Sequence, residues 1–401
     1  MLNCFYWYSI IWVLVFLLYN LGFSSFNKDL NGGLVFFIAC TSALAFLVGR
    51  LNRSKFKYSD FAIDYGTKPI VVIVILYVVN FVYAGDVPLF SILNKTQRYG
   101  DFEGMPLLYV VTSAVAFYYG INYFNAYLNS KKKRDLISFL VIIMLFLLVF
   151  SRSSILFLCF GAFILYLSSR KKHGTKERIV RMKSIMIAFF FGFITIYAFG
   201  ALGNVRSGYK FDDNSYIERI GLYEEFPSFI PKQFMWAYSY LTTPLANLNN
   251  NVKKENSGTN FSGVISELIP RTISKRLFPD LKYGVDAVME VGIEKEYFNA
   301  VTGYFIMYSY GGFIGMFLQF CVLLLVTYLQ IKLTKLEVNK GRENTTYIIL
   351  ILSNMLMFFY NSLNTTMVSW WLIINFFVLL KRPIRNSISK VINAHRRLND
   401  D

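Results

Sequence analysis

Charged residues are scarce in this 401-residue chain: they make up 16% of it, while 55% of the residues are hydrophobic and the mean hydropathy is +0.44. A water-soluble domain of this size does not need so much apolar surface. Long apolar stretches without charge are typical of membrane helices, because a helix satisfies its own backbone hydrogen bonds in lipid. The composition therefore predicts an all-α membrane protein.

Cysteine and histidine are rare as well. The four cysteines, Cys4, Cys40, Cys159 and Cys321, all lie in apolar stretches, and the two histidines lie in basic ones. This placement argues against a disulfide framework and against a thiolate metal site. The sequence also lacks a metal-ligand cluster, a P-loop and a dinucleotide-binding glycine pattern. We therefore expect no metal and no soluble cofactor.

Acidic residues are few relative to basic ones, with 24 Asp and Glu against 41 Lys and Arg, so the formal net charge is +17. Such a charge is also found in nucleic-acid-binding proteins. Here, however, the basic residues form short clusters between apolar stretches, as the positive-inside rule predicts for membrane proteins. We attribute the charge to membrane topology and expect membrane lipids, but no nucleic acid, as partners.

The apolar stretches predict about ten transmembrane helices. Seven lie in residues 1–202 and three in residues 302–380, separated by a large polar loop at 203–301 and followed by a basic tail at 381–401. The predicted spans are Cys4–Phe23, Leu30–Gly49, Pro69–Ala84, Pro106–Leu128, Leu136–Phe150, Ser154–Ser168, Ser184–Leu202, Thr302–Ile331, Tyr347–Leu363 and Met367–Leu380.

Basic and nearly uncharged connections alternate along the chain. The connections rich in Lys and Arg are 50–68, 131–134, 170–183, 332–342 and the tail. By the positive-inside rule these segments are cytoplasmic. Both termini are then predicted in the cytoplasm, and the loop at 203–301 on the outer, periplasmic face.

Arg152 is the only charged residue between Asp135 and Arg170. The preceding span, Leu136–Phe150, is only about 22 Å long at 1.5 Å per residue, so one alternative is a single kinked crossing that continues to Ser168. Both flanks of this whole stretch are basic, and one crossing would place one of them outside, which favours a short hairpin with Arg152 at its tip. An ionisable residue at membrane depth is a candidate functional residue. The alternative is an arginine that snorkels to the surface and merely ends two helices.

Other arginines are candidates in the large loop. Arg206 lies in Gly203-Asn204-Val205-Arg206-Ser207-Gly208, where glycines allow the backbone to approach a ligand. We assign Arg206 a catalytic role and Asn204, Arg219 and Arg271 a role in substrate binding. The alternatives are a plain turn with a headgroup anchor for Arg206 and surface charges for Arg219 and Arg271.

Aromatic and amide side chains are dense after residue 209. Trp236, Tyr238 and Tyr240 present flat apolar faces suited to sugar rings, and Asn247 offers an amide for sugar hydroxyls. We assign these four residues to substrate binding. Interfacial aromatic belts and small hydrophobic cores use the same residue types, so the alternative is a packing role.

Carboxylates are available in the loop for acid–base chemistry, and no histidine is. Glu290 and Glu296 lie close to the next apolar span, where a membrane-surface cavity would desolvate a carboxylate and raise its pKa. We therefore assign these two a catalytic role. Spacing alone does not separate them from the other acidic residues, which are Glu218, Glu224, Glu225, Glu267, Asp286 and Glu294.

Prolines divide the loop into short predicted helices. Pro231 is expected to open a helix that runs to about Thr243, and Pro244 to end it. Ser262 is expected to cap a second helix that runs through Ile269.

Several short motifs, taken with the topology, resemble one family: the bacterial oligosaccharide repeat-unit polymerases, the Wzy-type O-antigen polymerases. The matching segments are Gly85–Phe90 followed by Tyr99–Phe102 and Pro106, Ser151-Arg152, Gly203–Arg206, Trp236–Asn247 and the small-residue helix Tyr304–Gly315. One departure is that Arg206, Arg219 and Arg271 each lack the glycine eleven residues later that some members carry.

The resemblance implies a glycosyltransferase C-like enzyme in the bacterial inner membrane. Its substrates would be undecaprenyl-pyrophosphate-linked oligosaccharides, polymerised on the periplasmic face, and a chain-length regulator protein is a further expected partner. Arg152 and Arg206 would stabilise the departing pyrophosphate. The alternatives are an O-antigen ligase, which would be expected to carry a loop histidine, and a polysaccharide flippase or other transporter, in which repeated halves are common.

Overall fold

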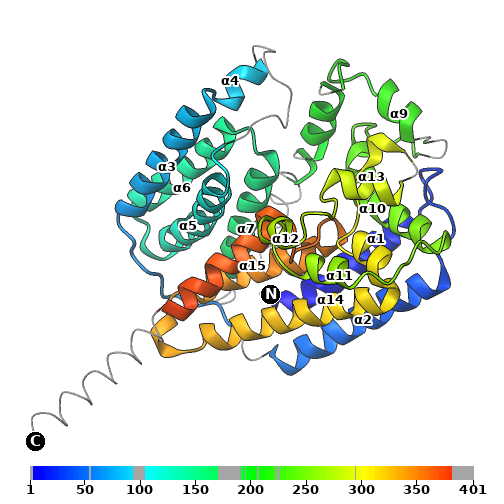
Figure 1. Cartoon of the computed structure of the whole chain (residues 1–401). Coiled ribbons are helices and arrows are strands. Elements are labelled where there is room, and N and C mark those ends of the chain that lie inside the picture. Colours follow the sequence, from blue (N-terminus) through cyan, green and yellow to red (C-terminus); the bar gives the residue numbers. More distant parts are fainter. Residues whose placement is uncertain are drawn as a thin grey trace, which may run out of the picture.

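The computed structural model describes residues 3–53, 56–93, 104–169, 190, 192–194, 196–205, 207–221, 223, 226–293 and 295–381. The regular secondary structure of these residues is entirely helical, as the composition predicts (Figure 1). The labelled helices are α1 (Cys4–Tyr19), α2 (Gly32–Leu51), α3 (Lys68–Ala84), α4 (Pro88–Leu93), α5 (Leu108–Ser130), α6 (Lys133–Leu148), α7 (Arg152–Ser169), α9 (Ser215–Gly221), α10 (Phe234–Lys253), α11 (Phe261–Leu268), α12 (Arg271–Leu277), α13 (Val285–Val291), α14 (Phe305–Thr334) and α15 (Glu343–Met355). Two more apolar helices run over Gly192–Val205 and Thr366–Lys381.

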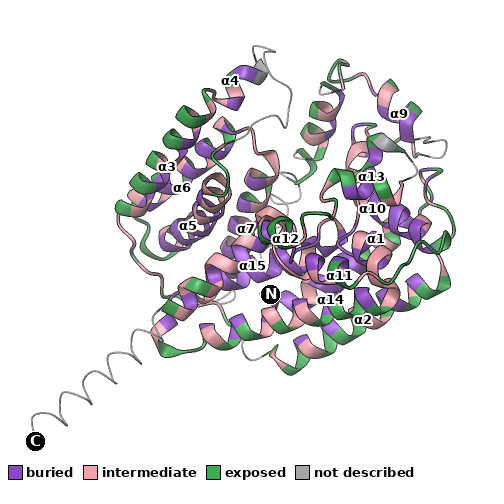
Figure 2. Cartoon of the chain, viewed as in Figure 1, coloured by how far each residue is buried: buried purple, intermediate pink, exposed green. Residues whose placement is uncertain are grey.

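Among the described residues, three helices are long and apolar enough to cross a membrane: α2, α7 and α14. Four shorter helices are also apolar: α1, α3, Gly192–Val205 and Thr366–Lys381. Large apolar side chains remain exposed on their outer faces, including Phe36 at 71%, Val82 at 75% and Ile314 at 85% (Figure 2). Such faces are suited to lipid. The helices thus indicate a membrane protein, and the number of about ten crossings stays a prediction.

Helix α15 lies at the centre of the molecule. It packs against α1 and α14 on one side and against α5 and α7 on the other, and every residue from Asn344 to Asn354 is buried. Helices α3, α5, α6 and α7 form one group and α1, α2, α10 and α14 form another (Figure 1). Because α15 contacts both groups, it holds the two halves of the fold together.

Polar side chains connect the buried helices. Asn354 Nδ2 on α15 donates to Thr327 Oγ1 on α14 at 3.0 Å. Asn375 Nδ2, on the helix Thr366–Lys381, donates to Gln330 Oε1 at 2.6 Å and its Oδ1 accepts from Thr346 Oγ1 at 3.1 Å. Hydrogen bonds between helices add stability and orientation where the surroundings are apolar.

The predicted hairpin between α6 and α7 is present. Phe150 adopts a left-handed conformation with φ 57°, and Ser151 N donates to Phe146 O at 2.9 Å while Phe150 N donates to Leu147 O at 2.8 Å. This pair of bonds is a Schellman motif, which ends a helix by satisfying its last carbonyl groups. The chain reverses at this point, and α7 begins at Arg152.

Two expectations about the large loop were wrong. Pro244 does not end a helix but lies inside α10, which continues to Lys253. A proline removes one backbone hydrogen bond, and the buried side chains on both sides of Pro244 pack well enough to carry the helix past it. Ser262 is not a cap either: α11 begins earlier, with Asn260 as the N-cap, and the Asn260 side chain accepts from Gly263 N at 2.8 Å.

Helix α14 is kinked at Gly312, which has φ 58° and ψ −152°. The segment before α11 pairs with the carbonyls next to the kink: Gly258 N donates to Ser309 O at 2.8 Å and Asn260 N donates to Tyr310 O at 2.9 Å. From Phe313 to Thr334 the helix is about 33 Å long at 1.5 Å per residue, close to the roughly 30 Å hydrocarbon core of a bilayer. The predicted span Thr302–Ile331 therefore contains a bend near its beginning.

Candidate functional site

The polar segment at 203–301 folds into short helices around α10. Helices α11 and α13 pack on α14, α12 follows α11, and α9 packs on α10, so that all of them gather beside the apolar helices (Figure 1). The described part of the segment is thus helical, as the sequence predicts, and the structure shows that it packs on the bundle. Its surface against the bundle positions several of the candidate residues.

Arg152 is the first residue of α7, directly after the turn at Phe150. Its guanidinium carbon lies 5.8 Å from the centre of the Phe150 ring. Two residues further on, Ser154 Oγ is 3.5 Å from Met367 Sδ, at the beginning of the helix Thr366–Lys381. The beginnings of these two helices therefore lie together.

Arg271 is anchored to the turn that precedes that helix. Its backbone N donates to Asn364 O at 2.9 Å, and its Nε donates to Asn364 Oδ1 at 3.2 Å. Within the described part of the chain, the two terminal nitrogens of its guanidinium have no hydrogen-bond partner. A side chain at Gly284 would come within 3.1 Å of one of these nitrogens. The guanidinium is thus fixed at Nε and has its terminal donors available.

The turn at 361–364 brings Arg152 and Arg271 to the same end of the helices. Asn364 Nδ2 donates to Ser266 O at 2.8 Å, and Trp370 Nε1 donates to Thr272 Oγ1 at 3.0 Å. Arg152 and Arg271 thus both lie near the N-terminal ends of two apolar helices. Guanidinium groups and helix N-termini both favour an anionic ligand such as phosphate.

Glu267 is a buried carboxylate beside Arg271. It is 7% exposed, and Asn361 Nδ2 donates to its Oε2 at 2.7 Å and to its main-chain O at 2.8 Å. Burial raises the pKa of the Glu267 carboxyl, whereas the Asn361 hydrogen bond and the charge of Arg271 oppose that rise. Burial likewise lowers the pKa of Arg271, opposed by Glu267. The site thus pairs a desolvated acid with a desolvated cation.

Asn204 and Trp236 form a structural junction. Asn204 is fully buried, its Nδ2 donates to Asn214 Oδ1 at 2.8 Å and to Phe211 O at 3.1 Å, and its Oδ1 accepts from Trp236 Nε1 at 2.7 Å. A side chain at Gly203 would come within 2.7 Å of the Trp236 ring. These contacts join the end of the helix Gly192–Val205 to α10, so both residues are engaged inside the protein.

Tyr238, Tyr240 and Asn247 also make internal contacts. The Tyr238 hydroxyl donates to Leu18 O at 3.0 Å and accepts from Asn27 Nδ2 at 2.6 Å. The Tyr240 ring stacks on Phe359 with the centroids 5.8 Å apart. Asn247 Nδ2 donates to the main-chain oxygens of two residues, Phe298 at 2.9 Å and Ala300 at 2.8 Å, which leaves the amide no hydrogen for a sugar.

Four predicted residues remain, namely Arg219, Glu290, Arg206 and Glu296. Arg219 is exposed on α9, and Glu290 is exposed on α13, where Lys282 Nζ is 3.4 Å from its Oε1. Arg206 lies outside the described residues. The backbone of Glu296 belongs to a short 3-10 helix, Glu296–Phe298, and its side chain is outside the description. Neither the exposure of Glu290 nor its surroundings support the catalytic role that the sequence suggested for it.

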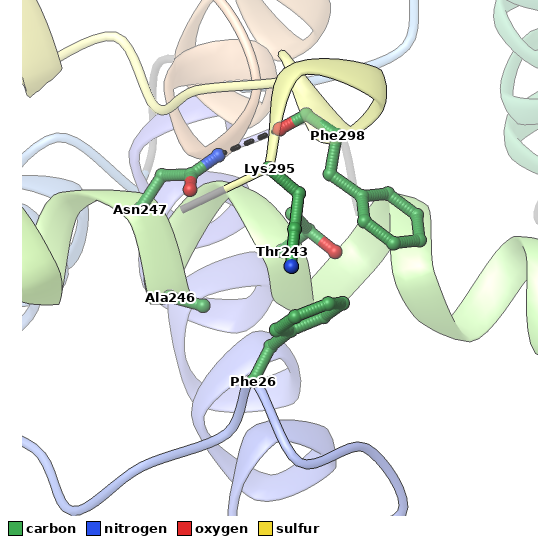
Figure 3. Close-up of a pocket in the computed structure, with 6 residues that line it drawn as sticks. All are labelled: Phe26, Thr243, Ala246, Asn247, Lys295 and Phe298. Carbon is green, nitrogen blue, oxygen red and sulfur yellow. Dashed lines mark hydrogen bonds between the residues drawn. The ribbon is translucent and has the colours of Figure 1, made fainter. Parts of the chain in front are cut away.

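A small pocket lies between α10 and the segment before α14 (Figure 3). Asn247 borders it, with its amide nitrogen pointing to Phe298 O, and the Lys295 side chain extends toward Phe26 and Thr243. The pocket has essentially no room for a water molecule. As it stands in this conformation, it does not accommodate a sugar.

Sequence reasoning did not single out Glu267, Asn361 or Asn364. Glu267 and Arg271 are four residues apart, a spacing that brings opposite charges together in a helix. Pro270 separates them into two helices, however, so the spacing alone was weak evidence for a contact. Nothing local indicated Asn361, which lies 94 residues from Glu267 in the sequence.

Comparison with known proteins identified no similar family model, curated protein or solved structure.

Proposed function

We propose that this protein polymerises undecaprenyl-pyrophosphate-linked oligosaccharide repeat units into O-antigen polysaccharide, as a glycosyltransferase C-like enzyme of the bacterial inner membrane with about ten crossings. The proposal starts from the family resemblance of the sequence. The observation that carries it further is that Arg152 and Arg271 lie at one end of the apolar helices, tied there by residues 364–370.

The chemistry of the substrate explains why two arginines would be needed. When the glycosidic bond to the lipid carrier breaks, negative charge develops on the departing pyrophosphate. The terminal nitrogens of Arg271 have no hydrogen-bond partner in the described chain and match phosphate oxygens in geometry. In a partly desolvated site such preorganised donors stabilise developing charge strongly. The polyprenyl chains would lie against the exposed apolar faces of the helices.

The test is a host strain in which the gene is deleted and replaced by variants. We expect the deletion to leave lipopolysaccharide with a single repeat unit. Arg152→Ala and Arg271→Gln should each lower the rate of polymerisation by about two to three orders of magnitude, as for the loss of a donor to developing charge. Arg276→Ala is the matched control, because Arg276 is exposed on the same short helix as Arg271.

The phenotypes separate the alternatives. Loss of all O-antigen in the deletion strain would indicate a flippase, and polymer that is made but not attached to lipid A–core would indicate a ligase. Normal polymer length in both arginine variants, with protein present in the membrane, would contradict the proposed role of this end of the molecule.

A further inference from the structure

The two oxygens of the Glu267 carboxyl group have different surroundings. Oε2 accepts a hydrogen bond from Asn361 Nδ2 at 2.7 Å. Among the described residues, no donor forms a hydrogen bond with Oε1. This oxygen is not completely enclosed by the protein. One oxygen is therefore held in place while the other is left to receive a proton.

Packing alone does not explain a carboxylate at this position. A glutamine would accept the same hydrogen bond from Asn361 without the cost of desolvating a charge. The site instead keeps an acid that is 7% exposed, with Arg271 four residues away and Asn361 as a fixed donor. Burial makes a carboxylate a stronger base than it is in water, so an enclosed and partly compensated carboxylate is suited to take up a proton from a hydroxyl.

We propose that Glu267 is the general base of the transfer reaction, with Asn361 as its positioning residue; this inference rests on the function proposed above. The acceptor is a sugar hydroxyl of a second lipid-linked unit. Its oxygen forms the new bond to the anomeric carbon of the donor as the bond to pyrophosphate breaks. The electron pair of that bond leaves on the pyrophosphate oxygen, beside the arginines. The hydroxyl proton passes to the Glu267 carboxylate and then to water.

This assignment replaces Glu290 as the candidate base. Glu290 is exposed, and its Oε1 lies 3.4 Å from Lys282 Nζ, so it lacks the enclosed surroundings of Glu267. Glu267 and Arg271 are also held at the same turn, because α11 and α12 are both bound to residues 361–364.

The experiment uses the purified full-length protein with synthetic lipid-pyrophosphate oligosaccharides. Glu267→Gln keeps the shape of the side chain and should lower kcat by about 10²- to 10⁴-fold, with KM for the donor changed only a few-fold. Glu267→Asp, which retains a carboxylate, should recover part of the rate. The matched control is Glu337→Gln, the same substitution at an exposed position, which should leave kcat unchanged. Size-exclusion profiles verify that each variant is folded.

The pH dependence distinguishes a base from a structural residue. The wild type should lose kcat/KM at low pH as Glu267 is protonated, and Glu267→Gln should lack this acid limb. Asn361→Leu removes the hydrogen bond that lowers the carboxyl pKa, so the limb should move to higher pH. A purely structural Glu267 would alter stability in these variants but leave the limb in place.

Stability gives an independent readout. Because the folded-state pKa is raised, the folded protein binds more protons than the unfolded chain between the two pKa values. As the pH rises through the raised pKa of Glu267, the free energy of unfolding of the wild type should therefore fall relative to that of Glu267→Gln.

Each result decides one of the two claims. If the wild type makes no polymer from synthetic units, the proposed function fails and this inference fails with it. If the wild type polymerises and Glu267→Gln retains more than a tenth of kcat with an unchanged acid limb, the function stands and the assignment of Glu267 is overturned.

Discussion

Buried asparagine side chains join segments of this chain that are distant in sequence. An amide has a donor and an acceptor, so one asparagine can satisfy both a carbonyl and an N–H group at a junction. Asn204 binds Asn214 and Trp236 in this way, and Asn251 Nδ2 donates to Phe305 O and Ser309 Oγ. At the scale of single residues, the amides that the sequence suggests for sugars are largely engaged in holding the structure.

Asn204→Leu should lower the free energy of unfolding by about 1–3 kcal/mol for each buried partner left without a hydrogen bond. Trp236 Nε1 and the Phe211 main-chain oxygen both lose their bonds in this variant. The measurement is thermal or denaturant unfolding in detergent. Asn250→Leu is the control, because Asn250 is half-buried and no side-chain hydrogen bond is found for it among the described residues. Equal losses in the two variants would contradict the junction.

At the scale of elements, the kink in α14 determines where α11 lies. The kink leaves two main-chain oxygens, of Ser309 and Tyr310, to accept from the segment before α11. Tyr310 also packs closely on Gly263, where an added side chain would come within 2.5 Å of the ring. Since Glu267 is on α11, the shape of α14 positions the proposed base.

Gly312→Ala should destabilise this arrangement by about 1–3 kcal/mol, because the backbone conformation at this residue is essentially restricted to glycine. We expect faster proteolysis between α10 and α11 and a lower polymerisation rate. Gly32→Ala is the matched control: Gly32 begins α2, and an added side chain there meets nothing within 4 Å. Unchanged proteolysis in Gly312→Ala would show that α11 does not depend on the kink.

At the scale of the whole molecule, the large polar segment and the 332–342 connection are predicted on opposite sides of the membrane. The basic 332–342 connection stays in the cytoplasm, and the parity of the predicted crossings then places the large segment outside. Helices α11 and α12 and the turn at 361–364 lie together where the site is found.

This orientation is tested by labelling single cysteines with a reagent that does not cross membranes, in a variant without the native cysteines. Asp280→Cys should react in intact cells opened only at the outer membrane, and Glu337→Cys should react only after the inner membrane is permeabilised. Both positions are exposed in the structure, so accessibility to solvent does not distinguish them. Labelling of Glu337→Cys from outside would reverse the topology.

The sequence by itself determined the helical class, the positions of the apolar helices, the hairpin before Arg152 and the helical nature of the large loop. These features follow from hydropathy and helix-forming patterns, which are properties of neighbouring residues. Tertiary structure alone decided that α10 passes through Pro244, that α14 bends at Gly312 and that Asn204 and Asn247 bind within the chain. It also decided the surroundings of Glu267, because its enclosure and its hydrogen bond to an amide 94 residues away both come from segments distant in sequence.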